Sequence, residues 1–429
     1  MRSLTQGRHL FIPVGLALSL VSACSDGGNG SSDFPSTSSS DSRKTTDVAT
    51  AYDPPLKFQQ QPAYDIAGGA GEGDWSIKLR GTVAYALSTG EVRAVSVLNG
   101  KRLWNVKPQG QPTRDTRYSI DGDSSPHFVE VQGQKAVLAA FSITEPGTGT
   151  TPDRPLIELT AIAVDSGKRL WTTAIERPTG EEEGEPFIAG ATATTAVLTF
   201  GSDDDAVSVG VSLLTQKATW TRKGFFASFV DGNTVVGRGG ADGLFGGSIT
   251  VEGRDLADGT KAWTYKHRIA QAKLSPVGNG LFTAVVEAPF EAEKGLAELL
   301  STSTGKTPSG LQRSRALAHV TSLSCWPGEG SVICEADKGL AKRVVALNQA
   351  NWTELWSIAE GDQNRLMPKI YTVFHDAVYG VTENGSVILD ARTGKDRATG
   401  TETPNAVNEY AGLFPSSGIG PFQTRRAVG

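Results

Sequence analysis

The sequence offers little from which a helix could be built. Apolar residues at positions i, i+3, i+4 and i+7 are scarce, and the best candidate, residues 289–300, is interrupted by Gly295. Methionine is rare, with two residues, whereas Gly (50) and Pro (21) are abundant beside many Val, Thr and Ser. This composition argues against a helical protein and favours strands joined by turns. We therefore predict an all-β chain.

Concentrated positive charge is also lacking, and so is an apolar run long enough to span a membrane. The formal charge is −5 and no dense basic stripe occurs, which argues against nucleic acid as a partner. The apolar run Leu10–Leu20 has eleven residues, about half of the ~20 that a membrane-spanning helix needs. Because Arg2 and Arg8 precede this run without any acid, we predict that residues 1–23 are a signal peptide.

Cysteine is scarce, with three residues, and the first of them follows the apolar run. The segment Val21-Ser22-Ala23-Cys24 resembles the bacterial lipobox, in which signal peptidase II cuts before a lipidated cysteine. The resemblance implies diacylglycerol on Cys24; the alternative is an ordinary secretory signal with an incidental cysteine. Residues 24–52 are rich in Ser, Gly, Thr and Asp, which predicts a disordered tether ahead of a folded part at 53–429.

The other two cysteines, Cys325 and Cys334, lie in the segment LSCWPGEGSVICEA. Two apolar runs flank a Pro-Gly turn there, and such a hairpin can bring the two cysteines opposite each other. In an exported protein this pair is expected to form a disulfide, the alternative being two free buried thiols. A metal site is not expected, because two cysteines alone lack a second pair of ligands.

A degenerate repeat runs along most of the chain. Residues 97–104 (VLNGKRLW) and 164–171 (VDSGKRLW) share six of eight positions, and five weaker copies follow. The seven copies end at Trp104, Trp171, Trp220, Trp263, Ser309, Trp356 and Ala398. Most spacings lie near 45 residues, and the longer first one is explained by an insertion at 144–155. A strand-rich repeat of this length predicts a β-propeller with one four-stranded antiparallel blade per repeat.

Two residue types in the repeat have a predicted structural role. A glycine allows a positive φ in the turn between the last two strands of each blade. A tryptophan fills the wedge between neighbouring blades and can donate its N–H to a backbone carbonyl. The predicted docking residues are the five tryptophans Trp104, Trp171, Trp220, Trp263 and Trp356 and the five glycines Gly100, Gly167, Gly259, Gly305 and Gly394.

The best copy, AIAVDSGKRLW at 161–171, has a recognisable form. The pattern A-x-D-x-x-[ST]-G-K-x-x-W resembles the tryptophan-docking repeat of quinoprotein-dehydrogenase-like propellers, the PQQ-repeat superfamily. After residue 398 only 31 residues remain, fewer than one repeat. We therefore predict that the extended segment 53–66 pairs with the C-terminal segment 408–428 to complete an eighth blade. Seven blades is the alternative.

The resemblance also bears on function. Pyrroloquinoline quinone dehydrogenases need a Ca²⁺ site, a catalytic Asp and a disulfide between adjacent cysteines. This chain has no Cys-Cys pair and no acidic cluster that matches their metal site. Asp121 and Asp123 resemble part of a calcium loop but lack the spaced Glu, and the acidic run 181–185 is typical of a solvated loop. We therefore predict no catalytic, cofactor-binding or metal-binding residue.

Other members of the superfamily, such as outer-membrane assembly lipoproteins and kinase sensor domains, use the ring as a protein-binding platform. The chain is accordingly expected to be a non-catalytic, monomeric scaffold on the outer face of the cell membrane. It would be held there by its lipid anchor and would bind a protein or an envelope polymer. The alternatives are a degenerate quinoprotein or sugar-active enzyme, and a ligand-sensing partner of a membrane protein.

Overall fold

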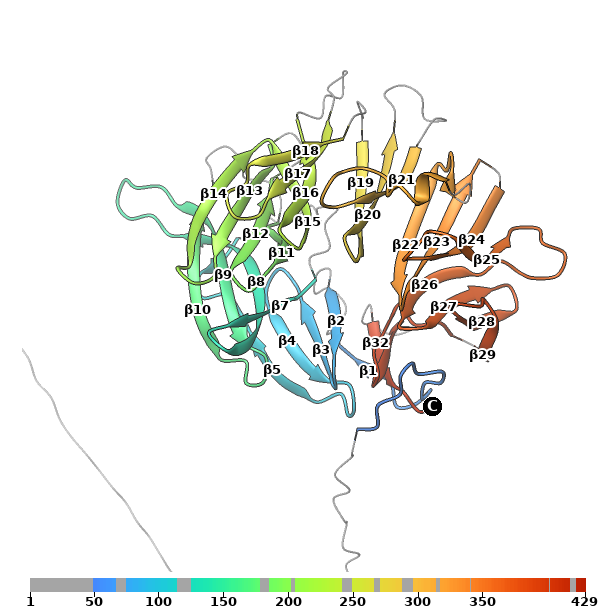
Figure 1. Cartoon of the computed structure of the whole chain (residues 1–429). Helices are drawn as coiled ribbons and strands as arrows, with labels where there is room; N and C mark the ends of the chain where they lie inside the picture. The colour runs from blue at the N-terminus through green and yellow to red at the C-terminus, as the bar shows by residue number, and fades with distance from the viewer. Residues whose placement is uncertain are drawn as a thin grey trace, which may run out of the picture. The chain divides into compact units, whose positions relative to one another are not determined.

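The computed structural model (Figure 1) describes most of the chain from residue 49 onward. The described ranges are 49–66, 75–113, 125–177, 185–201, 205–240, 249–265, 271–287, 296–313, 317–339, 341–400, 402–416 and 422–429. The predicted signal peptide, Cys24 and most of the predicted tether lie outside these residues.

The strands form eight antiparallel sheets, which are the blades of a β-propeller. Blade 1 contains β2 (Ser76–Arg80), β3 (Val83–Leu87), β4 (Val92–Ser96) and β5 (Arg102–Val106). Blade 2 contains β7 (His127–Val131), β8 (Gln134–Glu145), β9 (Arg154–Ala163) and β10 (Arg169–Glu176), with the short β6 (Gln111–Pro112) added beside β8. Blade 3 contains β11 (Phe187–Ala191), β12 (Thr195–Phe200), β13 (Val207–Ser212) and β14 (Lys217–Lys223).

The next blades follow in chain order. Blade 4 contains β15 (Phe225–Asp231), β16 (Thr234–Gly239), β17 (Thr250–Asp255) and β18 (Lys261–Thr264). Blade 5 contains β19 (Gln271–Gly278), β20 (Leu281–Glu287) and β21 (Leu296–Ser301), with the 3-10 helix η2 (Leu311–Arg313) after it. Blade 6 contains β22 (Ser322–Gly328), β23 (Ser331–Lys338), β24 (Ala341–Asn348) and β25 (Glu354–Ala359). Blade 7 contains β26 (Lys369–Phe374), β27 (Ala377–Thr382), β28 (Gly385–Asp390) and β29 (Asp396–Gly400).

Blade 8 joins the two ends of the folded part and confirms the predicted closure. It contains β30 (Ala406–Val407), β31 (Ala411–Pro415) and β32 (Phe422–Arg426) from the C-terminal segment and β1 (Tyr64–Asp65) as its outer strand. Tyr64 lies opposite Thr424. An isolated bridge joins Phe58 to Ala427, and the Tyr379 hydroxyl of blade 7 donates to the Pro55 carbonyl at 2.7 Å. Pairing of this kind covers two sheet edges that would otherwise be exposed.

The hydrophobic core is divided between the blades. Each of the eight seams, meaning the contact between two neighbouring blades, has its own cluster of buried residues. For example, the seam of blades 2 and 3 buries Ile157, Leu159, Leu198 and Phe200. Strands alternate between two apolar faces because a blade has neighbours on both sides. A single blade therefore has no complete core of its own.

One face of the propeller can be identified from hydrogen bonds between turns. In every blade an amide of the segment that follows the third strand donates to a carbonyl of the turn between the first two strands. The pairs are Val97–Thr82, Val164–Lys135, Leu213–Thr194, Leu256–Asn233, Thr302–Gly280, Gln349–Gly330, Ala391–Asp376 and Ala427–Tyr410. These turns therefore lie on the same side of the ring, which we name the turn face.

Two local predictions need correction. Residues 296–300, part of the segment named as the best helix candidate, form strand β21, because Ala297 and Leu299 are buried in the seam of blades 5 and 6. The rest of that segment lies outside the described residues. The predicted insertion at 144–155 is partly strand, since β8 and β9 extend to Glu145 and Arg154. Within the described ranges, no helix has the length and apolar character that crossing a membrane requires.

Candidate functional site

Four of the five repeated tryptophans dock on the next blade through the same hydrogen bond. The indole N–H donates at 2.9 Å to a carbonyl in the turn that follows the third strand of that blade. The donor and acceptor pairs are Trp104–Val164, Trp220–Leu256, Trp263–Thr302 and Trp356–Ala391. The indole ring covers the turn while its N–H satisfies a carbonyl, so each tryptophan links two blades.

The turn glycines meet these rings at close range. Gly167, Gly259 and Gly394 have φ values of 69°, 69° and 66°. A Cβ added to them would lie 2.5, 2.9 and 2.7 Å from the rings of Trp104, Trp220 and Trp356 respectively. Gly305 meets Trp263 in the same way. Glycine is therefore required there for close approach of the ring as well as for the positive φ.

Trp171 departs from this pattern, and its predicted hydrogen bond to a carbonyl is absent. Its indole nitrogen is buried without a hydrogen-bond partner among the described residues. The turn that follows in blade 3 has Gln216 at the glycine position, with a φ of 58°. A side chain at this position occupies the space into which the other tryptophans dock. The turn is instead held by the Thr173 hydroxyl, which donates to the Gln216 carbonyl at 2.9 Å.

At the seam of blades 5 and 6, the aromatic ring belongs to the turn of the later blade instead of to the earlier blade. Blade 5 has Ser309 where a tryptophan would stand, and blade 6 has Trp352 at the glycine position with a φ of 63°. Trp352 lies against blade 5, since a Cβ on Gly310 would be 2.7 Å from its Cδ1. The aromatic ring and the glycine have exchanged blades. The sequence contained a signal for this exchange, because Trp352 follows Asn351 at the position where five of the other six copies have glycine.

The closing seam uses a tyrosine instead of a tryptophan. A Cβ on Gly100, whose φ is 68°, would collide with the ring of Tyr64 on β1. Tyr64 thus covers the turn of blade 1 from the strand that completes blade 8. The repeat pattern did not reveal this residue, because β1 lies outside the seven copies. At the seam of blades 7 and 8, Ala398 is joined by Phe58 and Leu56 from the N-terminal segment.

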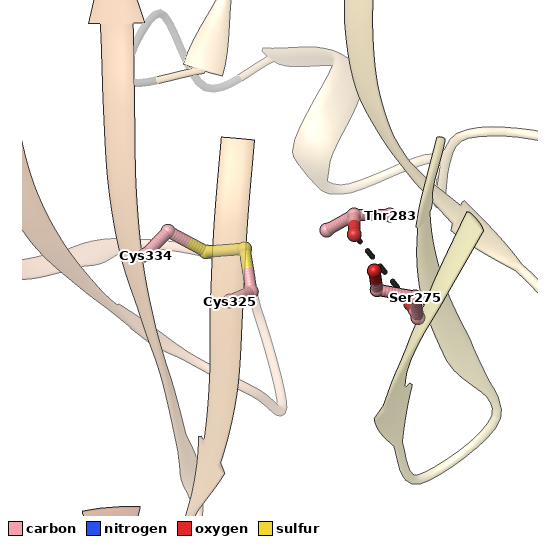
Figure 2. The surroundings of a disulfide bond; sticks show 4 residues. All are labelled: Ser275, Thr283, Cys325 and Cys334. Carbon is pink, nitrogen blue, oxygen red and sulfur yellow. Dashed lines mark hydrogen bonds between the residues drawn. A yellow bond between two sulfur atoms is a disulfide. The ribbon is translucent and has the colours of Figure 1, made fainter. Parts of the chain in front are cut away.

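Cys325 and Cys334 form a disulfide between β22 and β23 (Figure 2). The two residues lie directly opposite each other in the pairing of these strands. Cys334 is fully buried, and both sulfurs belong to the cluster between blades 5 and 6. The bond links the first two strands of blade 6 next to the seam in which Trp352 is reversed.

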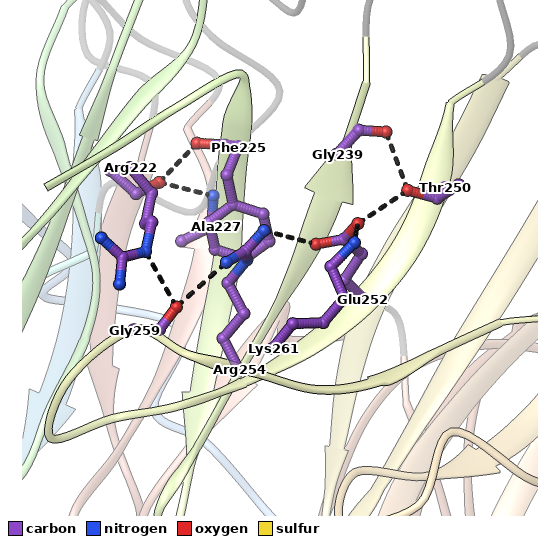
Figure 3. A network of polar contacts seen from close by, with 10 residues as sticks. Arg222, Phe225, Ala227, Gly239, Thr250, Glu252, Arg254, Gly259 and Lys261 are labelled. Atoms are coloured by element: carbon purple, nitrogen blue, oxygen red, sulfur yellow. Dashed lines mark hydrogen bonds and ion pairs between the residues drawn. The ribbon is translucent and has the colours of Figure 1, made fainter.

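A polar network surrounds the docking turn of blade 4 (Figure 3). The Glu252 side chain is 3% exposed and forms ion pairs with Arg254 and Lys261. Arg254 and Arg222 both donate to the Gly259 carbonyl, at 3.0 and 3.1 Å. These charges are paired within the protein, and they hold the turn on which Trp220 docks. The network therefore has a structural role.

Another acidic group lies near the seam of blades 2 and 3. Glu185 precedes β11, and burial raises the pKa of its carboxyl to about 7, with the nearby Arg177 opposing the shift. Arg177 also donates to the Ser142 hydroxyl at 3.0 Å. Asp121, Asp123 and residues 181–184, all considered from the sequence, lie outside the described residues. Within the described part of the chain, no group of three His, Cys, Asp or Glu residues has an arrangement that could hold a metal ion.

With this geometry established, the chain can be compared with known proteins. Residues 71–265, a little under half of the chain, match the family model described as outer membrane protein assembly factor BamB. The match covers blades 1 to 4, which hold four of the repeated tryptophans. The chain carries a PQQ-repeat β-propeller. No curated protein matches the sequence.

Solved structures give distant likenesses to this PQQ-repeat propeller. BamB from Moraxella catarrhalis is 15% identical with a TM-score of 0.43, over 86% of this chain and 98% of that one. The computationally designed Ika8 protein is 13% identical with a TM-score of 0.47, over 85% and 100%. A quinohemoprotein alcohol dehydrogenase from Pseudomonas putida HK5 is 11% identical with a TM-score of 0.42, over 85% and 75%. Likenesses this weak do not transfer a function.

Proposed function

We propose that the protein is a lipid-anchored scaffold of the cell envelope, whose propeller binds a protein or an envelope polymer without catalysing a reaction. The observation that carries the proposal is the match of blades 1 to 4 to a family described as an outer membrane protein assembly factor. The disulfide between Cys325 and Cys334 supports an oxidising compartment outside the cytoplasm. The propeller would act as a monomer.

The anchor in this proposal is Cys24. Residues 1–23 would be removed as a signal peptide, and residues 24–52 would tether the propeller to the outer face of the cell membrane. Substitution Cys24→Ala tests it by cell fractionation, with Ser25→Ala as the matched control. We expect Cys24→Ala to leave the chain unprocessed or to release it from the membrane, while Ser25→Ala behaves as the parent. An unchanged mass and unchanged membrane retention of Cys24→Ala would contradict the anchor.

Partner binding can be tested by placing a photo-crosslinking amino acid on each side of the ring. Leu214 lies in a turn of the turn face, and Lys338 is the last residue of β23, at the opposite side of the ring. Crosslinking in intact cells is expected to give a discrete adduct from at least one of the two positions. The absence of any adduct from either position, in cells that hold the folded protein, would argue against a scaffold.

The enzymatic alternative has a direct test. Pyrroloquinoline quinone and Ca²⁺ are added to the purified protein, and the absorbance of the quinone and the thermal midpoint are followed together. A scaffold is expected to show no saturable change in either signal. A saturable rise of the midpoint, accompanied by a shifted quinone spectrum, would replace the scaffold by a quinoprotein enzyme.

A further inference from the structure

Positive charge is concentrated on the turn face over blades 1 to 3. Six cations lie there in the turns or directly after them: Lys101, Arg102, Lys135, Lys168, Arg169 and Lys217. Only Glu130 and Asp165 bring negative charge among the described residues of these turns and the strand ends beside them. The whole chain has a formal charge of −5. This part of the turn face, which we name the basic sector, thus has the opposite sign to the protein.

The other described turns of this kind have no comparable excess of cations, although the turn of blade 5 carries Lys306 alone. In blade 4, Asp255 and Asp258 offset Arg254 and Lys261. In blade 7, Asp390 and Asp396 offset Arg392 and Lys395 in the same way, and these are the only acids and bases between β28 and Asp396. The excess of cations therefore belongs to blades 1 to 3 and is not a general property of the repeat.

The basic sector is one continuous surface. Trp104 of blade 1 donates to Val164 in the turn of blade 2, and the Arg169 guanidinium donates to the Lys107 carbonyl of blade 1. Thr173 of blade 2 donates to Gln216 in the turn of blade 3. Each turn is thus joined to the outer strand of the preceding blade, and the cations of three blades follow one another along the rim.

Two exposed leucines accompany these cations. Leu103, next to Arg102, is 48% exposed, and Leu214, in the turn before Lys217, is 62% exposed. Leu214 has the largest exposed fraction among the large hydrophobic residues that the structure describes as exposed. Cations interspersed with exposed leucines are typical of surfaces that lie in a membrane interface. The lysines bind anionic headgroups, and the leucines reach the apolar layer below them.

The N-terminal segment joins the propeller on the same face. The Tyr52 amide donates at 2.8 Å to Glu409, which lies in the turn between β30 and β31. Asp53 pairs with His375, which lies in the turn between β26 and β27. Blade 8 adjoins blade 1, where the Asn408 side chain donates to the Gly81 carbonyl at 2.8 Å. The chain therefore leaves residue 52 toward its N-terminus beside the basic sector.

From these observations we infer that the basic sector is a docking surface for an anionic lipid bilayer. The inference rests on the proposed anchor for its biological setting, since a chain tethered through residue 52 presents this face to the membrane. The propeller would lie with its turn face against the headgroups. The opposite face, with the loops that connect successive blades, would then remain open to a protein partner.

The test uses the Cys24→Ala chain, so that binding does not depend on lipidation. Its sedimentation is measured with vesicles of phosphatidylcholine alone and with vesicles that contain one third phosphatidylglycerol. We expect strong binding to the anionic vesicles only, weakened by added salt. The variant Lys101→Glu/Lys168→Glu/Lys217→Glu is expected to lose about 100-fold in partitioning, since each cation near such a surface contributes about a factor of 5. Any uncleaved signal peptide is common to all variants and cancels from the comparison.

The matched control makes the same charge change on the other side of the ring. Lys223→Glu/Lys338→Glu/Lys342→Glu is expected to bind anionic vesicles nearly as well as the parent. Leu214→Ser is expected to weaken binding by about 10-fold at any salt concentration, since it removes an apolar contact. Equal binding to both kinds of vesicle, or an equal loss in the control variant, would overturn the inference. Such a result would not contradict the proposed lipid anchor, which is tested separately by the release of Cys24→Ala from the membrane in cell fractionation.

Discussion

In two neighbouring seams, a repeated tryptophan packs against the turn of the next blade in different ways. At the seam of blades 3 and 4, Trp220 is 6% exposed, donates to Leu256 and lies over Gly259, whose carbonyl accepts from two arginines. At the seam of blades 2 and 3, Trp171 lacks a described partner and faces a turn with Gln216. Gln216 adopts a φ of 58° without being glycine. The comparison shows that glycine is needed in the turn chiefly because a ring docks on it.

The largest expected difference between the two seams comes from removing the tryptophans. Trp220→Ala is expected to lower the free energy of unfolding by about 3–5 kcal/mol, since it deletes a buried ring and leaves a cavity. Trp171→Ala is expected to cost less than half as much, because its ring is partly exposed and its N–H makes no described hydrogen bond. Denaturation in urea measures both values. Equal losses would contradict the distinction between docked and undocked rings.

Reduction of the disulfide tests whether blade 6 is independent of these seams. Opening the short loop between Cys325 and Cys334 is expected to cost about 2–3 kcal/mol, because the unfolded chain regains freedom. The thermal midpoint with and without reductant measures the loss. Because the bond lies in a different seam, the difference between Trp220→Ala and Trp171→Ala should persist in reductant. A midpoint that does not respond to reductant would indicate that the bond does not form.

The two turns can be compared directly by alanine substitution. Gly259→Ala is expected to cost about 2 kcal/mol, since alanine is strained at a φ of 69° and its Cβ would meet the Trp220 ring. Gln216→Ala keeps a Cβ where one already exists, so it is expected to change stability by less than about 0.5 kcal/mol. Thermal midpoints of the pair give the contrast. A neutral Gly259→Ala would refute the role of close approach.

The stability of the seam of blades 2 and 3 is also expected to depend weakly on pH. Burial raises the pKa of Glu185 to about 7, from an ordinary value of 4.5. The folded protein therefore holds a proton that the unfolded chain has released between these values, and stability falls as the pH rises from 4.5 to 7. The loss is expected to be about 1 kcal/mol after allowance for solvent screening.

Glu185→Gln serves as the control for this titration, because it keeps the size of the side chain and removes the charge. The variant is expected to be more stable than the parent at pH 8 and nearly equal to it at pH 4.5. Denaturant midpoints measured across this range give the answer. Parallel curves for parent and variant would exclude Glu185 as the titrating group.

The repeat made the fold predictable because its period and turn glycines recur at fixed offsets. In the structure, four of the repeated tryptophans donate to a turn of the next blade, and the five glycines have positive φ values in such turns. The sequence shows that Gln216 and Trp352 depart from the turn glycine, but how the rings pack was not predictable, because it depends on residues of the neighbouring blade. Trp171 fails to dock on account of Gln216, and Trp352 docks backward on account of Gly310. Nothing in either local sequence states which blade will lie beside it.

The basic sector, too, could not be predicted without knowing how the blades lie in space. No dense basic stripe exists along the sequence, yet turns that lie tens of residues apart form a basic sector on one face of the ring. Lys101, Lys168 and Lys217 each follow the turn after the third strand of a blade, so the repeat itself distributes them. Their cumulative charge becomes visible only when the blades are arranged in space, because acids balance the equivalent lysines of blades 4 and 7.

The shared eighth blade has a consequence for biogenesis. Strand β1 pairs with β32, and more than 350 residues separate them along the chain. During synthesis from the N-terminus, β1 is made at the start and its partner β32 is made last. At about 5–20 residues per second, synthesis of the chain between these two strands takes roughly 20–70 seconds. The ring stays open during that time. Ile66, fully buried in the finished ring, lacks its blade 8 neighbour Ala411 for that interval. The ring therefore cannot close until its last strand has been made, whereas a propeller whose closing blade is local in sequence has no such delay.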